Sequence, residues 1–209
     1  MTPAQEPARP AVDAIIVAGG GGERLGGVVK GDLDLGAGRL LDGILAACAT
    51  ARTRVVVGDL TVPDGVLVAH EDPPGGGPAA GTVAGLRALP DADDEDDSLV
   101  LLLASDLPAP ARGVNTLLAQ SDSLRQGAAD GVCLAGDDGY PQWLFGLYRR
   151  AALERAAALV GTGHDVAMKR MVAPLRLDTL PGDWTTIGDV DTWADADRWR
   201  SHLAAEEDS

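Results

Sequence analysis

The chain is 209 residues long, 45% hydrophobic and 3% aromatic, and carries a formal net charge of −15. This length suits a single domain, and the hydrophobic content is too high for a disordered chain. A surface this acidic excludes nucleic acid and anionic membranes as partners, because neutralising phosphates requires clustered Lys and Arg. A substrate that carries phosphates would therefore need a local positive pocket.

Residues 1–11 contain three prolines and few apolar side chains. We expect a disordered leader there, one domain over residues 12–204, and an acidic tail over residues 205–209. Within the domain, short apolar runs alternate with segments of helical periodicity. The predicted strands are Ala14–Ala18, Arg54–Gly58, Val66–Ala69, Leu99–Ala104, Gly131–Ala135, Trp143–Tyr148 and a short one near Leu175–Leu177. The predicted helices are Arg39–Ala51, Ala80–Leu89, Pro110–Gln120, Arg149–Leu159 and Thr192–Leu203.

The run Leu99–Ala104 is the most hydrophobic of these strands. A continuous apolar run indicates burial on both faces, as in a parallel sheet. Strands that alternate with helices over short connections predict a doubly wound α/β fold with right-handed crossovers. We therefore expect a single-domain, Rossmann-like architecture, in which a mostly parallel sheet carries helices on both faces.

The cysteines and the apolar runs indicate the compartment. Cys48 and Cys133 lie far apart, without a second ligand at metal spacing, which predicts two reduced thiols. The N-terminus lacks the charged-then-apolar pattern of a signal peptide. The longest apolar runs are too short to cross a bilayer, which takes about 20 residues. We expect a cytoplasmic protein.

The strongest chemical signal is the segment Val17–Lys30 (VAGGGGERLGGVVK), directly after the first predicted strand. The glycines at 19–22 let backbone N–H groups approach a ligand without hindrance from a Cβ and form an anion-binding concavity. Arg24 and Lys30 add the positive charge that a triphosphate requires. In open α/β sheets ligands bind outside the carboxyl ends of strands, where this loop falls. The segment predicts a triphosphate site.

Two other glycine-loop motifs are rejected on spacing. A dinucleotide fingerprint needs a glycine three residues after Gly-x-Gly, but Arg24 follows Gly21 at that distance and Leu25 follows Gly22. A P-loop needs Gly-Lys-Ser/Thr, whereas Lys30 lies between Val29 and Gly31.

Asp106 lies in the segment Ser105–Pro108, at the end of the most buried predicted strand. A carboxylate there faces the same crevice as the glycine loop and suits Mg²⁺, which prefers hard oxygen ligands shared with substrate phosphates. The alternative is that Asp106 caps the next helix.

A second glycine loop, Glu71–Gly81 (EDPPGGGPAAG), follows the third predicted strand. A long connection at the ligand edge of a sheet favours a binding role over a purely structural one. Within it, Asp72 is a candidate to accept hydrogen bonds from a base or ribose.

A further acidic segment, Asp189–Thr192 (DVDT), precedes the last predicted helix. It has two open interpretations: an N-cap that satisfies free N–H groups, or a second carboxylate for the metal. The three histidines form no catalytic motif with a Ser or Cys, and we assign them no catalytic role.

Together these motifs resemble the molybdenum cofactor guanylyltransferases and their wider molybdopterin nucleotidyltransferase relatives. Val17–Gly20 and Arg24–Gly27 are similar to that family's Leu-Ala-Gly-Gly and Arg-Met-Gly-Gly, and Lys30 to the lysine of its Asp-Lys pair. Gly77–Gly81 is similar to Gly-Pro-Leu-Ala-Gly, with Asp72 as the preceding acid. Asp106–Pro108 and Asp189–Thr192 are similar to Asp-Met-Pro and Asn-x-Asn-Thr. The departures are Val29 for the acid before the lysine, Gly58 for an Asn, Ala79 for Leu, and Asp for both closing Asn residues.

The resemblance implies magnesium-dependent nucleotidyl transfer, in which molybdopterin phosphate attacks the α-phosphorus of GTP and pyrophosphate is released. The expected catalytic residues are Arg24, Lys30 and Asp106, and the expected Mg²⁺ ligands are Asp106 and Asp191. The expected nucleotide-binding residues are Val17, Ala18, Gly19, Gly20, Gly21, Gly22, Lys30, Asp72, Gly77 and Gly81. Residues 141–143 (PQW) lie where such enzymes meet the acceptor, although a strand start with Trp143 in the core explains them as well.

Two alternatives to this function stay open. The first is nucleotidyl transfer to another phosphorylated acceptor, of the molybdopterin cytidylyl, sugar-phosphate or phospholactate type. The second is a non-catalytic module that binds nucleotide or docks a partner, for which the departures at Val29, Ala79 and the two closing Asp residues argue.

Overall fold

The computed structural model describes residues 12–19, 25–36, 38–91 and 98–207. The predicted leader, most of the acidic run 91–97, and Gly20–Arg24 in the first glycine loop lie outside the described residues.

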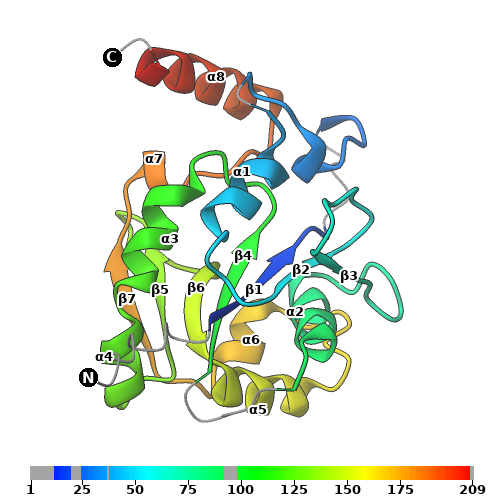
Figure 1. Cartoon of the computed structure of the whole chain (residues 1–209), viewed down its shortest axis with the longest axis vertical. Coiled ribbons are helices and arrows are strands. Elements are labelled where there is room, and N and C mark those ends of the chain that lie inside the picture. The colour runs from blue at the N-terminus through cyan, green and yellow to red at the C-terminus, as the bar shows by residue number, and fades with distance from the viewer. Residues whose placement is uncertain (1–11, 20–24, 37, 92–97, 208–209) are drawn as a thin grey trace, which may run out of the picture.

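A seven-stranded sheet forms the centre of the molecule, with strand order β3-β2-β1-β4-β6-β5-β7 (Figure 1). All neighbouring pairs are parallel except the two made by β6, which runs antiparallel to β4 and to β5. The predicted mostly parallel sheet is therefore confirmed. The strands are β1 Val12–Val17, β2 Arg54–Val57, β3 Leu67–Ala69, β4 Leu99–Ala104, β5 Gly131–Ala135, β6 Pro141–Arg149 and β7 Leu177–Pro181.

Helices cover both faces of this sheet, as predicted. Side chains alternate along β1, so that Ile16 packs with α1 and α3 on one face while Ile15 packs with α2, α5 and α6 on the other. The helices are η2 Lys30–Asp32, α1 Leu40–Ala47, α2 Pro78–Ala88, α3 Pro110–Leu118, α4 Ser121–Gln126, α5 Arg150–Val160, α6 Met168–Val172, α7 Trp184–Ile187 and α8 Trp193–Glu207.

A third, smaller core lies away from the sheet, where α8 packs on the segment that precedes α1 (Figure 1). Trp199 and Ala196 of α8 belong to one buried apolar cluster with Leu33 and Leu35 there. This packing brings the C-terminal helix over the segment that carries Lys30. The helix runs to Glu207, three residues into the segment expected as a tail.

The short helices α4, α6 and α7 were not predicted. They contain six, five and four residues, too few turns to show a repeating apolar face. The last strand was expected near Leu175–Leu177 but begins at Leu177, where it pairs with Gly131 of β5. Tertiary pairing sets this boundary, so local sequence does not indicate it.

A buried ion pair ties β1 to its surroundings. Asp13 is fully buried, and its carboxylate accepts hydrogen bonds from Arg52 Nε at 3.0 Å and Nη2 at 2.6 Å. Arg150 Nη1 lies 3.7 Å from the same carboxylate. This bidentate arrangement compensates the loss of hydration of the buried charge.

None of the helices in the described part of the chain is long and apolar enough to span a membrane.

Candidate active site

The carboxyl ends of four parallel strands meet at one edge of the sheet. Val17 of β1 pairs with Val57 of β2 and with Ala104 of β4, and Val57 pairs with Ala69 of β3. The loops that leave these strands therefore start side by side. Because β6 is antiparallel, its first residues arrive at this same edge rather than its last ones.

Three carboxylates gather at this edge. One oxygen from each of Asp106, Asp189 and Asp191 lies within 4.8 Å of the others. Asp106 lies two residues after the end of β4, whereas the other two come from the connection between α7 and α8. Three converging carboxylate oxygens are a suitable set of ligands for a hard divalent cation such as Mg²⁺ or Mn²⁺.

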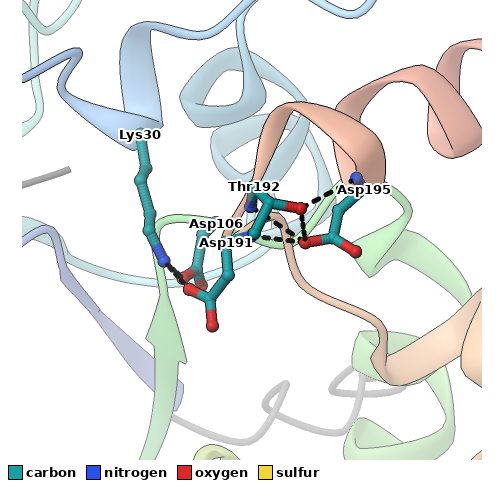
Figure 2. A network of polar contacts seen from close by, with 5 residues as sticks. All are labelled: Lys30, Asp106, Asp191, Thr192 and Asp195. Atoms are coloured by element: carbon teal, nitrogen blue, oxygen red, sulfur yellow. Dashed lines mark hydrogen bonds and ion pairs between the residues drawn. The ribbon is translucent and has the colours of Figure 1, made fainter. Parts of the chain in front are cut away.

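Lys30 contacts two of these carboxylates (Figure 2). Its Nζ donates to Asp106 Oδ2 at 2.8 Å and also to Asp191 Oδ1. The Lys30 side chain is 18% exposed and that of Asp106 is 17% exposed. The ammonium and the carboxylates thus form one partly buried cluster that joins positions 30, 106 and 191.

The charges of this cluster shift its pKa values. Burial lowers the pKa of Lys30, but its ion pairs and hydrogen bonds with Asp106 and Asp191 outweigh burial and raise it. Asp189 is exposed as a residue, but partial desolvation of its carboxyl, and then the negative charges of Asp106 and Asp191, raise its pKa. A divalent cation would relieve the repulsion that raises the pKa of Asp189.

The start of α8 positions Asp191 (Figure 2). The carboxylate of Asp195 accepts hydrogen bonds from the backbone N–H of Asp191 at 3.3 Å and of Thr192 at 2.9 Å, and from Thr192 Oγ1 at 2.7 Å. Thr192 Oγ1 in turn accepts from the backbone N–H of Asp195 at 3.2 Å. This reciprocal pair is a capping box. Thr192 and Asp195 therefore cap the helix, and the carboxylate of Asp191 points to Lys30 instead.

Asp106 does not cap the following helix either. The N-cap of α3 is Ala109, which makes no side-chain cap hydrogen bond. The capping alternative for Asp106 is therefore wrong, and its carboxylate is held by Lys30.

Two neighbouring cavities open at this edge and share Ala18 and Gly19. The smaller, about 140 Å³, is bounded by Lys30 and Asp106 and also by Val17, Pro78, Ala104, Ser105 and Leu144. The larger, about 350 Å³, lies between the first and second glycine loops and is bounded also by Val29, Val57, Gly58, Asp59, His70, Glu71, Pro74, Gly75 and Gly77.

Glu71 is the acid of the second loop that faces the larger cavity. Its Oε2 accepts a hydrogen bond from the backbone N–H of Gly76 at 2.7 Å. Asp72, the residue singled out from sequence, is exposed and lies outside the lining of this cavity. The side chains of consecutive residues diverge here, so the two acids of the Glu-Asp pair have different surroundings.

The backbone conformation at position 58 requires a glycine. Its φ is +134°, and a Cβ there would lie 3.2 Å from the carbonyl oxygen of Ala18. Gly81 is a packing position, because a Cβ would lie 2.6 Å from Val17 Cγ1. Gly81 is a buried residue of α2 that packs against β1, whereas Gly77 is the N-cap residue of α2, has φ +85° and lines the larger cavity.

The structure therefore brings together most of the predicted site residues that it describes. Lys30, Asp106 and Asp191 form one cluster, and Val17, Ala18 and Gly19 lie beside it. Gly20, Gly21, Gly22 and Arg24 lie outside the described residues, and their roles stay predictions.

Residues 141–143 form the start of β6 at the same edge. Leu144 lines the smaller cavity, while Trp143 packs against the core of the α2 face. The rings of Tyr140 and Trp143 lie 5.2 Å apart. The core packing of Trp143 matches the structural alternative, and the acceptor role stays a prediction.

Sequence reasoning missed Glu71, Asp195 and the position of Asp189 in the cluster. The Thr-x-x-Asp spacing of Thr192 and Asp195, directly before a helical segment, is a signal that would have found the capping box. The other two lie in segments that the sequence marked, Glu71–Gly81 and Asp189–Thr192, but which acid of each segment faces the site depends on how distant segments meet.

Comparisons with known proteins identify the family and the fold of the chain. Residues 14–179 match the family described as the MobA-like NTP transferase domain. The segment of Asp189 and Asp191 lies beyond the matched residues. No curated protein sequence matches the chain significantly.

Solved structures with the same fold share little sequence with the chain. Molybdopterin-guanine dinucleotide biosynthesis protein A from Archaeoglobus fulgidus has a TM-score of 0.71 at 17% identity, over 92% of this chain and 99% of that one. Rv0371C from Mycobacterium tuberculosis in complex with manganese has a TM-score of 0.65 at 17% identity, over 91% and 98%. The 4-diphosphocytidyl-2C-methyl-D-erythritol synthase from Anaerococcus prevotii has a TM-score of 0.67 at 14% identity, over 93% and 96%.

The mostly parallel α/β sheet and the family match identify the chain as a nucleotidyltransferase of the α/β class. The chain belongs to the MobA-like NTP transferase domain family.

Proposed function

We propose that the protein transfers GMP from GTP to the phosphate of molybdopterin and releases pyrophosphate, with Mg²⁺ as the metal. The observation that carries this proposal is the cluster of Lys30 with Asp106, Asp189 and Asp191 beside a cavity walled by two glycine loops. A cation site next to a cavity of this kind suits a nucleoside triphosphate, whose phosphates share the metal with protein oxygens.

Guanine is favoured by the chemistry of the larger cavity. A carboxylate accepts hydrogen bonds only, and each of its oxygens has two lone pairs. Guanine carries adjacent N1–H and N2–H donors, which match the two oxygens of a carboxylate, whereas cytosine offers only its N4 amine. Glu71 supports GTP as the substrate for this reason, and its Oε2 also accepts a hydrogen bond from the backbone N–H of Gly76.

The reaction follows from charge and position. An oxygen of the acceptor phosphate forms a bond to the α-phosphorus as the bond from that phosphorus to the bridging oxygen of the β-phosphate breaks. The nucleophile is already an anion, so no protein base is needed and catalysis comes from positioning and charge neutralisation.

The protein groups have distinct tasks in this scheme. Asp106, Asp189 and Asp191 would hold the divalent cation, which neutralises phosphate charge when bound. Lys30, and Arg24 from the first loop, offset the charge that develops on the leaving pyrophosphate. The backbone N–H groups of the first glycine loop cradle that group.

A nucleotide panel tests the proposal. GTP, CTP, ATP and UTP are each added with and without Mg²⁺, and the melting temperature is measured. A ligand that binds the native state raises stability by about 2.7 kcal/mol at 100 Kd. We expect a Mg²⁺-dependent rise with GTP that exceeds the rise with the others, followed by pyrophosphate release when molybdopterin is supplied.

A larger rise with CTP would replace guanylyl with cytidylyl transfer. Nucleotide binding without pyrophosphate release for molybdopterin or other phosphorylated acceptors would favour a binding module.

A further inference from the structure

The ammonium of Lys30 lies where a cation bound by Asp106 and Asp191 would need to lie. Its Nζ donates to one oxygen of each carboxylate, and Figure 2 shows the end of the Lys30 side chain directed at the two adjacent carboxylates. Asp189 completes the group of three oxygens within 4.8 Å. An ammonium and a divalent cation repel each other and bind the same carboxylate oxygens, so they compete for this position.

We propose that Lys30 occupies the cation position in the free protein and leaves it when the phosphates of the nucleotide arrive, so that the metal site opens as the triphosphate binds. This inference rests on the proposed function, because it takes the carboxylate cluster to be the metal site. It adds that the free protein binds divalent cations weakly on account of its own side chain.

Lys30 also lines the smaller cavity, where its ammonium could pair with the phosphates of a bound nucleotide. The same cavity is lined by Gly19 and Pro78, from the two glycine loops expected to hold the nucleotide. A triphosphate there offers anionic oxygens within the same cavity. When the ammonium moves to these oxygens, it pairs with phosphate charge, and the carboxylates of Asp106 and Asp191 become free to bind the metal cation.

The choice of lysine supports an exchange. Lys30 and Lys169 are the only lysines of the chain, and every other permanent side-chain cation is an arginine. The chain uses Arg52 and Arg150 for the fixed ion pair with Asp13. Arginine holds carboxylates in a planar, bidentate fork, whereas lysine is a compact charge on a flexible stem. A lysine therefore suits an ion pair that has to break and re-form.

Exchange of this kind couples the two ligands. If phosphate binding removes the competitor of the metal, metal binding must favour phosphate binding by the same factor.

The first test measures Mn²⁺ binding without nucleotide, from the electron paramagnetic resonance of free Mn²⁺. Lys30→Met removes the ammonium and keeps the length of the side chain. We expect Lys30→Met to bind Mn²⁺ about tenfold more tightly than the wild type, since a like charge is removed from the site. Arg176→Met is the matched control: it also removes one positive charge, from an exposed side chain at the opposite edge of the sheet, and should bind Mn²⁺ like the wild type. Equal or weaker binding by Lys30→Met overturns the proposal.

The second test uses the wild-type protein and so does not depend on how a variant folds. With ¹⁵N-labelled lysine, Lys30 and Lys169 give two ammonium signals, and Lys169 is the internal control. We expect Mg²⁺ to change the Lys30 signal and leave that of Lys169 in place. A Lys30 signal that stays unchanged while Mg²⁺ binds overturns the exchange.

These outcomes separate the inference from the function. If the wild type turns over and Lys30→Met has unchanged Mn²⁺ affinity, the exchange at Lys30 is rejected and the proposed function is kept. No Mn²⁺ binding by either protein, with no metal-dependent turnover, removes both.

Discussion

Thr192 and Asp195 each bind the backbone N–H of the other through a side-chain oxygen, at 2.9 Å and 3.2 Å. The same carboxylate of Asp195 also accepts from the backbone of Asp191, whose own side chain faces Lys30. One capping box therefore begins α8 and orients a residue of the carboxylate cluster.

Asp195→Ala should weaken the metal site without removing a ligand. Loss of an outer partner of a ligand costs about 10–100-fold in metal affinity, and loss of a cap costs about 1 kcal/mol of stability. We expect Mn²⁺ affinity to fall by about tenfold, as measured by titration calorimetry. Asp197→Ala is the control, because it removes an exposed acid of the same helix, paired with Arg200. Equal Mn²⁺ affinities in the two variants would show that the capping box is only structural.

Asp106→Asn and Lys30→Ala should each lower kcat/KM by about 100-fold or more, since loss of one charged group at the transferring phosphates costs about 3 kcal/mol. Pyrophosphate release measures turnover, and circular dichroism checks the fold. Asp64→Asn, at an exposed position between β2 and β3, should behave like the wild type. Turnover near the wild-type rate in Asp106→Asn or Lys30→Ala would remove that residue from the catalytic set.

Glu71→Gln should reduce the preference for guanine. The variant keeps an oxygen that can accept from Gly76 but loses one of the two acceptors offered to the base. We expect KM for GTP to rise by about tenfold, and the advantage of GTP over inosine triphosphate, which lacks the 2-amino group, to shrink.

Asp72→Asn is the matched comparison for Glu71→Gln. Because Asp72 is exposed and outside the cavity lining, this variant should keep the KM of the wild type. The reverse pattern, with the larger effect at Asp72, would return base recognition to the residue chosen from sequence.

Asp13→Asn should destabilise the fold strongly. It leaves Arg52 and the buried Arg150 without the charge that they share, and breaking a buried pair costs about 3–5 kcal/mol. Urea unfolding measures the change. Asp178→Asn, an exposed position in β7, should change the free energy of unfolding by less than about 0.5 kcal/mol. A loss below about 1 kcal/mol in Asp13→Asn would contradict the prediction.

Alkaline pH should destabilise the protein through its thiols. Burial raises the pKa of Cys48 to about 12, with Arg54 opposing it, and burial raises that of Cys133 to about 11. In the unfolded chain a thiol ionises near pH 8.5, so above that pH unfolding releases a proton. The stability is complete below pH 8.5 and is lost as the pH rises toward the folded-state pKa.

Cys48→Ala isolates one of these contributions. Between pH 8 and pH 10 the wild type should lose about 2 kcal/mol more of its free energy of unfolding than the variant. Urea unfolding at both pH values measures it. Parallel losses in the two proteins would mean that Cys48 ionises equally in the folded and unfolded states.

The fold could be predicted where a segment is itself strongly patterned. The strands Leu99–Ala104 and Gly131–Ala135 have the bounds that their apolar runs indicate. The start of β6 at Pro141 could not be predicted, since its pairing with Ala135 depends on a turn and on an irregular register.

The site could be predicted where a residue lies shortly after a strand or in the glycine-rich loop that follows one. Asp106 lies two residues after the end of β4, and Lys30 lies at the end of the glycine-rich segment that follows β1, as the sequence predicts. Their contact with Asp191 joins positions 161 residues apart in sequence, and it forms because α8 folds back over the segment before α1. Such a return is a property of packing and leaves no local pattern.

The antiparallel strand β6 divides the sheet into two parts. The parallel strands β1 to β4 carry the loops assigned to the nucleotide, whereas β5, β6 and the turn between them reach the same edge from a later part of the chain. Because a hairpin turn can change length without shifting the register of β1 against β4, residues 136–140 can vary without disturbing the strands that carry the loops assigned to the nucleotide. The order of the strands thus makes this turn separable, in evolution and in engineering, from the parallel half of the sheet.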